Sequence, residues 1–251
     1  MNPFTFLLRH VRAFLRTTIV LVLTFILVLL AGLLQIFQVP HPVIFGLFRV
    51  WRRLVLWTIN LQITVEGPTP QRPGIVMPNH RSYADVLVIP TRFPIVFVSM
   101  AAVKKWPSIG WGAQALDTVF VDRSDPDSRR KTREQLDDRL QKGESVIIFP
   151  EGGTHRGPDI RELKPGMFHT VAQGNIPIHP VAIEFRDPGM AWVGKQSFFG
   201  HYWKNFGKAR IEVAVRFGEE LTGTEGEKLR NQMASWLTSQ LAEMRQRWDQ
   251  H

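Results

Sequence analysis

The fold is decided by the stretch IVMPNHRSYADVLVI, residues 75–89. Its first residues, Ile75–Met77, are apolar and rich in β-branched side chains, which predicts a short buried strand. A polar turn follows, and a short helix is predicted over Ala84–Ile89. A strand that ends in polar residues and leads into a helix is the basic unit of an α/β domain.

The same alternation of short apolar runs and polar, helix-like stretches continues toward the end of the chain. Further strands are predicted over Ile95–Ser99, Thr118–Val121, Ser145–Phe149, Ile178–Ile183 and Ile211–Phe217. Further helices are predicted near Lys104–Ala115, Pro126–Gln141, Lys164–Gln173 and Thr224–Gln250, the last opening with a capping box made by Thr224 and Glu227. We therefore expect an α/β fold with a mixed, largely parallel sheet flanked by helices, occupying residues 62–251.

Residues 1–61 form a different kind of segment, which we expect to anchor the chain to a membrane. Thr17–Val39 has 23 residues without a charge, and a helix of that length is roughly 34 Å long, enough to cross a hydrocarbon core of about 30 Å. A buried core helix and a cleavable signal peptide are the alternatives, but no small-x-small cleavage site follows the run. Beyond Pro40-His41-Pro42, the stretch Val43–Leu61 resembles a helix lying in the membrane interface.

The positive charge is concentrated around this apolar segment. No acidic residue occurs before Glu66, and six arginines give that stretch +6 of the total net charge of +9. A nucleic-acid-binding protein would carry its excess on the folded body, so we expect membrane lipids and not nucleic acid as partners. Three arginines lie on each side of the apolar run, so their count does not separate a single span from a re-entrant hairpin. The hairpin is mildly favoured, because it keeps both basic ends on the cytoplasmic side.

Polar residues follow three of the predicted strands, at the carboxyl ends where open α/β sheets bind their ligands. The first strand leads to His80 and Asp85, another leads to Arg123, and a third leads to the segment Glu151-Gly152-Gly153-Thr154. We expect these groups to share one cleft. Arg123 is suited to a phosphate, because a guanidinium binds two oxygens at once, whereas the alternative is a surface arginine. The two glycines would allow close backbone approach to a ligand, or form a plain turn.

His80 and Asp85 would face each other only if His80 lies in the turn and Asp85 in the first helical turn, because five helical residues rotate the chain by about 140°. The carboxylate would then keep one imidazole nitrogen protonated and leave the other to take a proton from a substrate hydroxyl. The alternative is that Asp85 only caps its helix, since Ser82-x-x-Asp85 resembles a capping signal.

Four blocks of the chain, taken in order, resemble the signature blocks of the glycerolipid acyltransferases. They are His80-x4-Asp85, residues 106–123, the segment FPEGGT over 149–154 and the segment IPIHPVAI over 176–183. The resemblance is strongest to the 1-acyl-sn-glycerol-3-phosphate (lysophosphatidate) acyltransferases. It implies that His80 is the general base, that Asp85 orients it, and that Arg123, Glu151 and Gly152 bind the glycerol-phosphate, with Gly153 and Thr154 in the same loop.

The resemblance also implies that Pro180 shapes the acyl-donor side and that acyl-CoA or acyl-carrier protein is the donor. No metal and no bound cofactor would be needed. The expected location is a bacterial inner membrane, with the catalytic domain on the cytoplasmic face. Two departures concern the acceptor: Met100 and Ala102 stand where relatives often have lysine and glutamate, and Gly153 intervenes before Thr154. Lysophosphatidate is thus the first expectation, and another lysolipid such as lyso-ornithine lipid is the alternative.

Three other functions fit the residues less well. A hydrolase would lack both a Gly-x-Ser-x-Gly elbow and a cysteine, which leaves Ser82 as its nucleophile. A zinc enzyme would draw on His80, His155, His169 or His179, none of which has the spacing of a zinc motif. A non-catalytic membrane tether is conceivable because of the charge missing at Met100. We therefore expect an acyltransferase.

Overall fold

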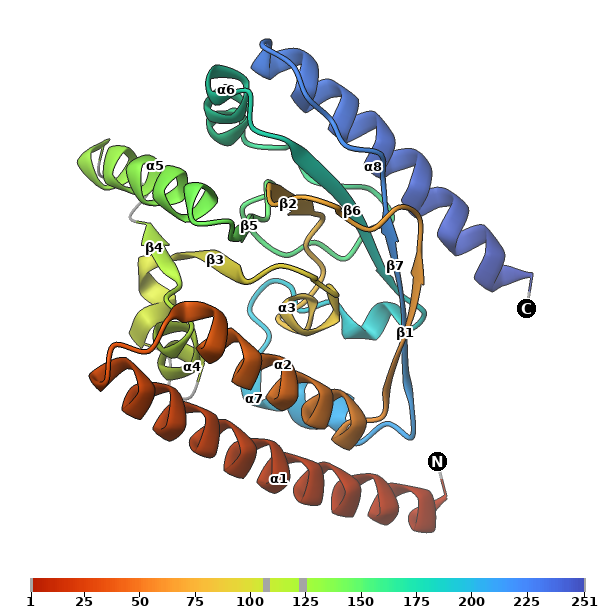
Figure 1. The fold of residues 1–251 in the computed structure, drawn as a ribbon. Helices are drawn as coiled ribbons and strands as arrows, with labels where there is room; N and C mark the ends of the chain where they lie inside the picture. Colours follow the sequence, from red (N-terminus) through yellow and green to blue (C-terminus); the bar gives the residue numbers. More distant parts are fainter. Residues whose placement is uncertain (1, 106–108, 122–125, 251) are drawn as a thin grey trace.

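The computed structural model describes residues 2–105, 109–121 and 126–250, which form a seven-stranded sheet between two layers of helices (Figure 1). The strands are β1 Leu61–Glu66, β2 Ile75–Pro78, β3 Ile95–Met100, β4 Val119–Val121, β5 Ser145–Ile147, β6 Ile178–Phe185 and β7 Ile211–Phe217. They lie in the order β1-β7-β6-β2-β5-β3-β4. Neighbours run parallel except β6 and β7. The predicted mixed, largely parallel sheet is confirmed.

Helices cover both faces of this sheet. One face carries α5 (Pro126–Gln141), α6 (Pro165–Gly174) and α8 (Gly226–Asp249), and the other carries α2 (His41–Thr58), α3 (Asp85–Val88) and α7 (Phe198–Phe206), as Figure 1 shows. The alternation of side chains along β2 explains the two layers: Val76 packs in the core on the side of α2, and Ile75 and Met77 pack on the side of α8. The described residues therefore form one large hydrophobic core on each face of the sheet.

The shorter elements fill the edge near β3 and β4 and the connection after β6. They are the 3-10 helices η1 (Ala101–Lys105) and η2 (Pro188–Met190) and the helix α4 (Ile109–Ala115). The single helix predicted over Lys104–Ala115 is thus two elements, and residues 106–108 between them lie outside the described residues. The predicted capping box of the last helix is wrong, because Glu225 is its N-cap and makes no side-chain cap bond.

The N-terminal helix, α1 (Pro3–Ile36), starts well before the predicted Thr17. Asn2 caps it by accepting a hydrogen bond from the N–H of Phe4 at 3.1 Å, and Pro3 follows in the first turn, where its missing N–H costs nothing. At 34 residues the helix is about 51 Å long. It is long and apolar enough to cross a membrane by length and composition.

Both ends of α1 nevertheless rest on the α/β body. Near its start, Arg9 donates to the carbonyl of Lys204 at 2.8 Å, and Arg16 donates to those of Phe206 and Lys208 at 3.0 and 2.6 Å. These carbonyls lie at the C-terminal end of α7, where the helix dipole attracts cations. At the other end, Gln35 donates to the carbonyl of Ala115, the last residue of α4, at 3.3 Å. The helix therefore runs along the body (Figure 1).

Several of the N-terminal arginines have partners within the protein. Arg9, Arg12 and Arg16 donate to backbone carbonyls of the body. Arg52 of α2 likewise donates through Nε to the carbonyl of Leu87, in the short helix that carries Asp85, at 2.5 Å. Guanidinium groups suit this task because they offer several donors in a fixed plane. Four of the six N-terminal arginines therefore fasten the two N-terminal helices to the rest of the protein, and binding of lipid headgroups by this segment stays a prediction.

The outward face of α1 is apolar and open. Large side chains such as Phe14, Phe25 and Leu29 are 59%, 66% and 61% exposed. Exposure of an apolar surface of this extent to water is unfavourable, which supports membrane association. The inner helix α2 differs, since its Phe45, Phe48 and Val55 belong to the hydrophobic core. The predicted helix over Val43–Leu61 ends at Thr58, and Leu61 begins β1, because Asn60 turns the chain in a left-handed conformation (φ 51°).

Candidate active site

The site begins where β2 leaves the sheet. Asn79 continues the pairing of β2 with β6 through its side chain: its amide nitrogen donates to the carbonyl of Ile183 at 2.9 Å, and its amide oxygen accepts from the N–H of Ile183 at 2.7 Å. Asn79 is fully buried, so these bonds are made in a low-dielectric interior where each is stronger than in water. The chain therefore enters the next residue, His80, in a fixed direction.

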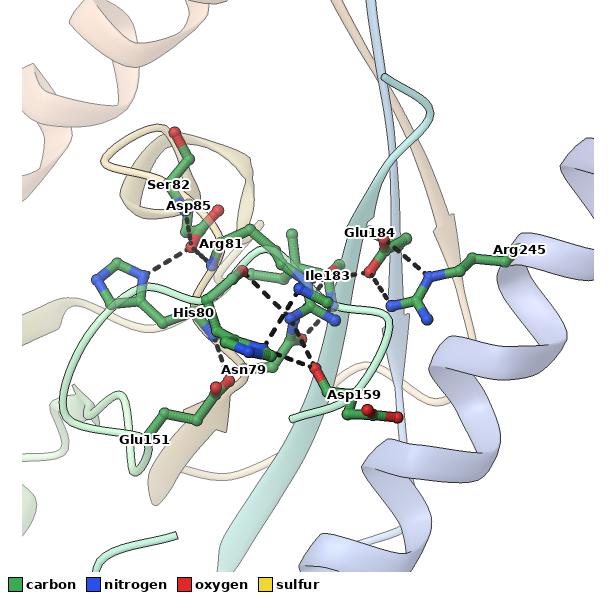
Figure 2. A network of polar contacts seen from close by, with 12 residues as sticks. Asn79, His80, Arg81, Ser82, Asp85, Glu151, Asp159, Ile183, Glu184 and Arg245 are labelled. Atoms are coloured by element: carbon green, nitrogen blue, oxygen red, sulfur yellow. Dashed lines mark hydrogen bonds and ion pairs between the residues drawn. The ribbon is translucent and has the colours of Figure 1, made fainter. Parts of the chain in front are cut away.

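His80 and Asp85 lie together as the spacing requires, with His80 in the turn and Asp85 as the first residue of α3. Nδ1 of His80 is 2.7 Å from Oδ2 of Asp85 (Figure 2). The Asp85 side chain is 0% exposed, whereas that of His80 is 19% exposed. A carboxylate only accepts hydrogen bonds, so Nδ1 carries the proton and Nε2 is the basic nitrogen. Nε2 lies on the far edge of the ring, away from the polar network of Figure 2.

Asp85 also shapes the turn. Its Oδ2 accepts hydrogen bonds from the backbone N–H groups of Arg81 and Ser82, at 2.7 and 2.9 Å. The two interpretations of Asp85 drawn from the sequence are therefore compatible, because one oxygen orients the imidazole and holds the turn before the helix. The other oxygen, Oδ1, is buried without a hydrogen-bond partner among the described residues.

The ring of Phe149 supports the imidazole from one side. The two ring centroids are 3.9 Å apart and the planes are 23° from parallel. Phe149 follows β5, which is the parallel neighbour of β2. The imidazole is thus held by a carboxylate at its edge and by an aromatic ring on its face.

Glu151 faces the protein's own backbone. Its Oε1 accepts from the N–H of His80 and its Oε2 accepts from the N–H of Arg161, both at 2.8 Å. The residue is 1% exposed. Burial raises the pKa of the Glu151 carboxyl, and the two N–H groups oppose that effect by stabilising the anion. Glu151 therefore links the turn that carries His80 to the loop with Arg161, and its assignment to the glycerol-phosphate stays a prediction.

The glycine loop after Glu151 lies beside this link. The N–H of Gly152 bonds the carbonyl of Phe149 at 3.1 Å, and the hydroxyl of Thr154 donates to the carbonyl of Trp192. A Cβ at Gly153 would lie 2.8 Å from Nη1 of Arg161. The additional glycine therefore lets this guanidinium fold over the loop, a close approach that the sequence pattern did not reveal.

The remaining predicted site residues are Arg123 and Pro180. Arg123 lies outside the described residues. The strand before it, β4, is at the edge of the sheet, and β5 and β3 separate it from β2. Pro180 is buried within β6, paired with Met77, and its carbonyl accepts from the N–H of Gly218 at 2.9 Å. The described structure thus brings together His80, Asp85 and the Glu151–Thr154 loop.

The residues proposed for other chemistries are not arranged for it. Ser82 is fully buried, and its Oγ is 3.4 Å from the N–H of Ala84 in its own turn. Nε2 of His179 is 3.0 Å from the carbonyl of Arg72, close to the opposite end of β2 from His80. Among the described residues there is no group of three or more His, Cys, Asp or Glu side chains that could hold a metal ion.

The imidazole of His80 follows a parallel strand and is held in orientation, and its Nε2 faces outward. Such an imidazole can take a proton from a hydroxyl group, which is typical of an α/β enzyme. Comparisons with known proteins then give the class. Residues 62–184 match the family model described as Acyltransferase. The chain is 31% identical over 180 residues to a lyso-ornithine lipid O-acyltransferase of Pseudomonas aeruginosa, covering 70% of this chain and 69% of that protein.

Two further relatives extend the comparison. A 1-acyl-sn-glycerol-3-phosphate acyltransferase of Neisseria meningitidis is 27% identical over 175 residues, which is 66% of this chain and 68% of that protein. The crystal structure of the 1-acyl-sn-glycerophosphate acyltransferase PlsC from Thermotoga maritima covers 95% of each chain with a TM-score of 0.68 at 18% identity, and so shows the same fold. The chain belongs to the acyltransferase family that these proteins represent.

Proposed function

We propose that this acyltransferase moves a fatty acyl group from acyl-CoA or acyl-carrier protein to the free hydroxyl of a lysolipid, with His80 as the general base. The observation that carries the proposal is the 2.7 Å contact between Nδ1 of His80 and the buried carboxylate of Asp85, which leaves Nε2 to accept a proton. No metal and no bound cofactor enters the proposed reaction. Membership of the acyltransferase family supports an acyl group as the group that is transferred. The geometry of His80 and Asp85 supports His80 as the base.

The proposed reaction proceeds in two steps. Nε2 removes the proton from the lysolipid hydroxyl as its oxygen attacks the carbonyl carbon of the thioester. The resulting tetrahedral intermediate expels the thiolate, which takes the proton back from the imidazolium. The Asp85 carboxylate stabilises the imidazolium in between and keeps the ring oriented. The products are an ester and a free thiol, so protons and electrons balance.

Two acceptors fit this chemistry, and they differ in the headgroup. Lysophosphatidate, which the sequence predicts first, is the acceptor type of the Neisseria relative. Lyso-ornithine lipid is supported by the relative at 31% identity. It also agrees with Met100, exposed at the end of β3, and Ala102, exposed in η1, because the positive charge that relatives often have at this place is missing. We therefore favour lyso-ornithine lipid and keep lysophosphatidate as the second candidate. Arg161 would supply positive charge for the anionic group of either one.

The membrane arrangement we propose follows from α1. Because both ends of this helix contact the body, it lies along one leaflet with its exposed apolar face in the lipid, instead of crossing to the other side. In a bacterium this leaflet would be the cytoplasmic one of the inner membrane, where acyl-CoA and acyl-carrier protein are available. The lysolipid would then arrive from the membrane and the donor from the aqueous phase.

The test is an assay of the purified protein with each lysolipid and each donor in turn. We expect acyl transfer to at least one of the two acceptors, unchanged in strong chelator, and none by His80→Ala. A preference for lyso-ornithine lipid supports the favoured acceptor, and a preference for lysophosphatidate selects the second. A folded wild-type protein that acylates no lysolipid with either donor would refute the proposal and favour the tether.

A further inference from the structure

Arg81, the residue next to His80, sends its side chain into the protein, away from the imidazole (Figure 2). It is 2% exposed. Its Nη1 donates to the carbonyls of His155 and Asp159, at 3.3 and 3.1 Å. These carbonyls belong to the loop that continues from Glu151 and Thr154. Arg81 therefore ties the turn that carries the base to the loop expected to bind substrate.

Glu184, near the end of β6, holds Arg81 in place. Nε of Arg81 donates to Oε2 of Glu184 at 3.1 Å. From the other side, Arg245 of α8 donates through Nε to Oε1 and through Nη2 to Oε2, both at 3.1 Å (Figure 2). A two-point contact between a guanidinium and a carboxylate restricts both groups in orientation as well as distance. The contacts therefore lead from Arg245 to Glu184, from Glu184 to Arg81, and from Arg81 to the loop that contains His155 and Asp159.

The loop passes close to both guanidiniums at Gly157. Its φ is +88°, and a Cβ there would lie 3.0 Å from Nη2 of Arg245 and 3.3 Å from Nη2 of Arg81. Glycine is thus required for this close approach. The N–H of His155 also donates to the carbonyl of His80 at 2.8 Å. The two loops are consequently joined at several points, and Arg81 is the only charged side chain among the described residues that bonds to this loop from the catalytic turn.

We propose that Arg81, Glu184 and Arg245 are positioning residues that set the distance between the His80 imidazole and the loop Gly152–Thr154. This inference rests on the proposed role of His80. None of the three touches the reacting atoms, so their effect is on the alignment of base and substrate. A small displacement of a catalytic group lowers the turnover rate, up to about 100-fold for about 1 Å. The last helix of the chain would thus influence the rate of a reaction at the other side of the sheet.

The test uses Arg245→Met, because this side chain is 24% exposed and its loss leaves the core intact. The matched control is Arg247→Met, which removes an arginine of the same helix that bonds Glu66 and Glu243, away from the site. We expect Arg245→Met to lower kcat about 10-fold with unchanged KM for acceptor and donor. Arg245→Lys should restore part of the rate, because it keeps the charge. Arg247→Met should keep the wild-type kcat.

A second measurement does not depend on turnover. The rate at which diethyl pyrocarbonate modifies His80, followed by mass spectrometry, should rise at least twofold in Arg245→Met and stay at the wild-type value in Arg247→Met. Should Arg245→Met fail to fold, Glu184→Gln takes its place, since it keeps the side-chain shape and removes the shared charge. Equal kcat and equal modification rates in Arg245→Met and the control would overturn the proposal, as would a change confined to KM. A failure of the proposed reaction itself would appear differently, as a wild-type protein without acyl transfer.

Discussion

Replacing Asp85 by asparagine tests the centre of the proposed mechanism. The asparagine oxygen can take the place of Oδ2 and still accept from the imidazole and from the N–H groups of Arg81 and Ser82. Its NH2 group would then lie where Oδ1 is buried, a position without a hydrogen-bond partner among the described residues. The substitution therefore keeps the turn and removes the negative charge beside the imidazole.

The expected loss of rate is large. In a histidine–aspartate pair that serves as a general base, removing the carboxylate costs up to about 10⁴-fold in kcat. General-base catalysis as a whole contributes about 10²–10⁴-fold. For Asp85→Asn we expect kcat to fall by about 10²–10⁴-fold, which is about 2.7–5.4 kcal/mol in the activation free energy. Two unsatisfied N–H donors should also lower the free energy of unfolding by about 1–3 kcal/mol.

The assay measures kcat for acyl transfer and the thermal unfolding of the same preparations. A residue that only capped its helix would cost about 0.5–2 kcal/mol of stability and leave the rate of the folded protein intact. If the Asp85→Asn enzyme is folded and keeps kcat within about threefold of wild type, Asp85 is a cap and the reasoning is wrong.

Three other predictions concern the base, the acceptor site and the membrane surface. His80→Ala should remove all measurable turnover while the protein stays folded by circular dichroism; residual activity above 1% of wild type would point to another base. Arg161→Ala should raise the KM for an anionic acceptor about 10-fold, the effect of one charge-assisted hydrogen bond, and a rise in the donor KM instead would place Arg161 on the donor side. The double substitution Phe25→Asp and Leu29→Asp, on the exposed face of α1, should move the protein from the membrane to the soluble fraction with an unchanged fold; retention in the membrane would locate the contact elsewhere.

Deleting residues 1–61, a simpler test of the anchor, would damage more than the anchor. Phe45, Phe48 and Val55 of α2 belong to the same core as Val76 of β2. Their removal would expose apolar core surface on one face of the sheet, at a cost of about 25 cal/mol for each Å². Point substitutions on the outer face of α1 therefore separate membrane binding from folding, which the deletion does not.

The sequence predicted those parts of the molecule in which the signal is local. β7 was found with its observed bounds, Ile211–Phe217, because β-branched and aromatic residues stand at every second position of this segment. The contact of His80 with Asp85 could be predicted because the two are five residues apart. α7, by contrast, was missed. Its sequence FFGHYWKNF has aromatic residues on several faces, so it shows no single apolar stripe, and packing against α1 and the body decides which of its residues are buried.

What the sequence could not show were contacts between distant positions. Glu184 is 103 residues from Arg81 and 61 from Arg245, and no spacing rule connects them. The bonds of Arg9 and Arg16 to the body could not be predicted, because their partners are backbone carbonyls, which carry no signature in the sequence. β1 was missed for a related reason, because its partner strand, β7, begins 145 residues after β1 ends.

The position of α1 along the body has a consequence for lipid traffic. With α1 in a single leaflet, as proposed, the enzyme would take its acceptor from that leaflet and return the product to it, and neither lipid would pass through the bilayer. The two sides of the membrane would then receive the new lipid unequally. Growth of the opposite leaflet would require a separate transporter of the flippase type. This transporter would act after the enzyme and carry the product's headgroup across the apolar interior of the membrane.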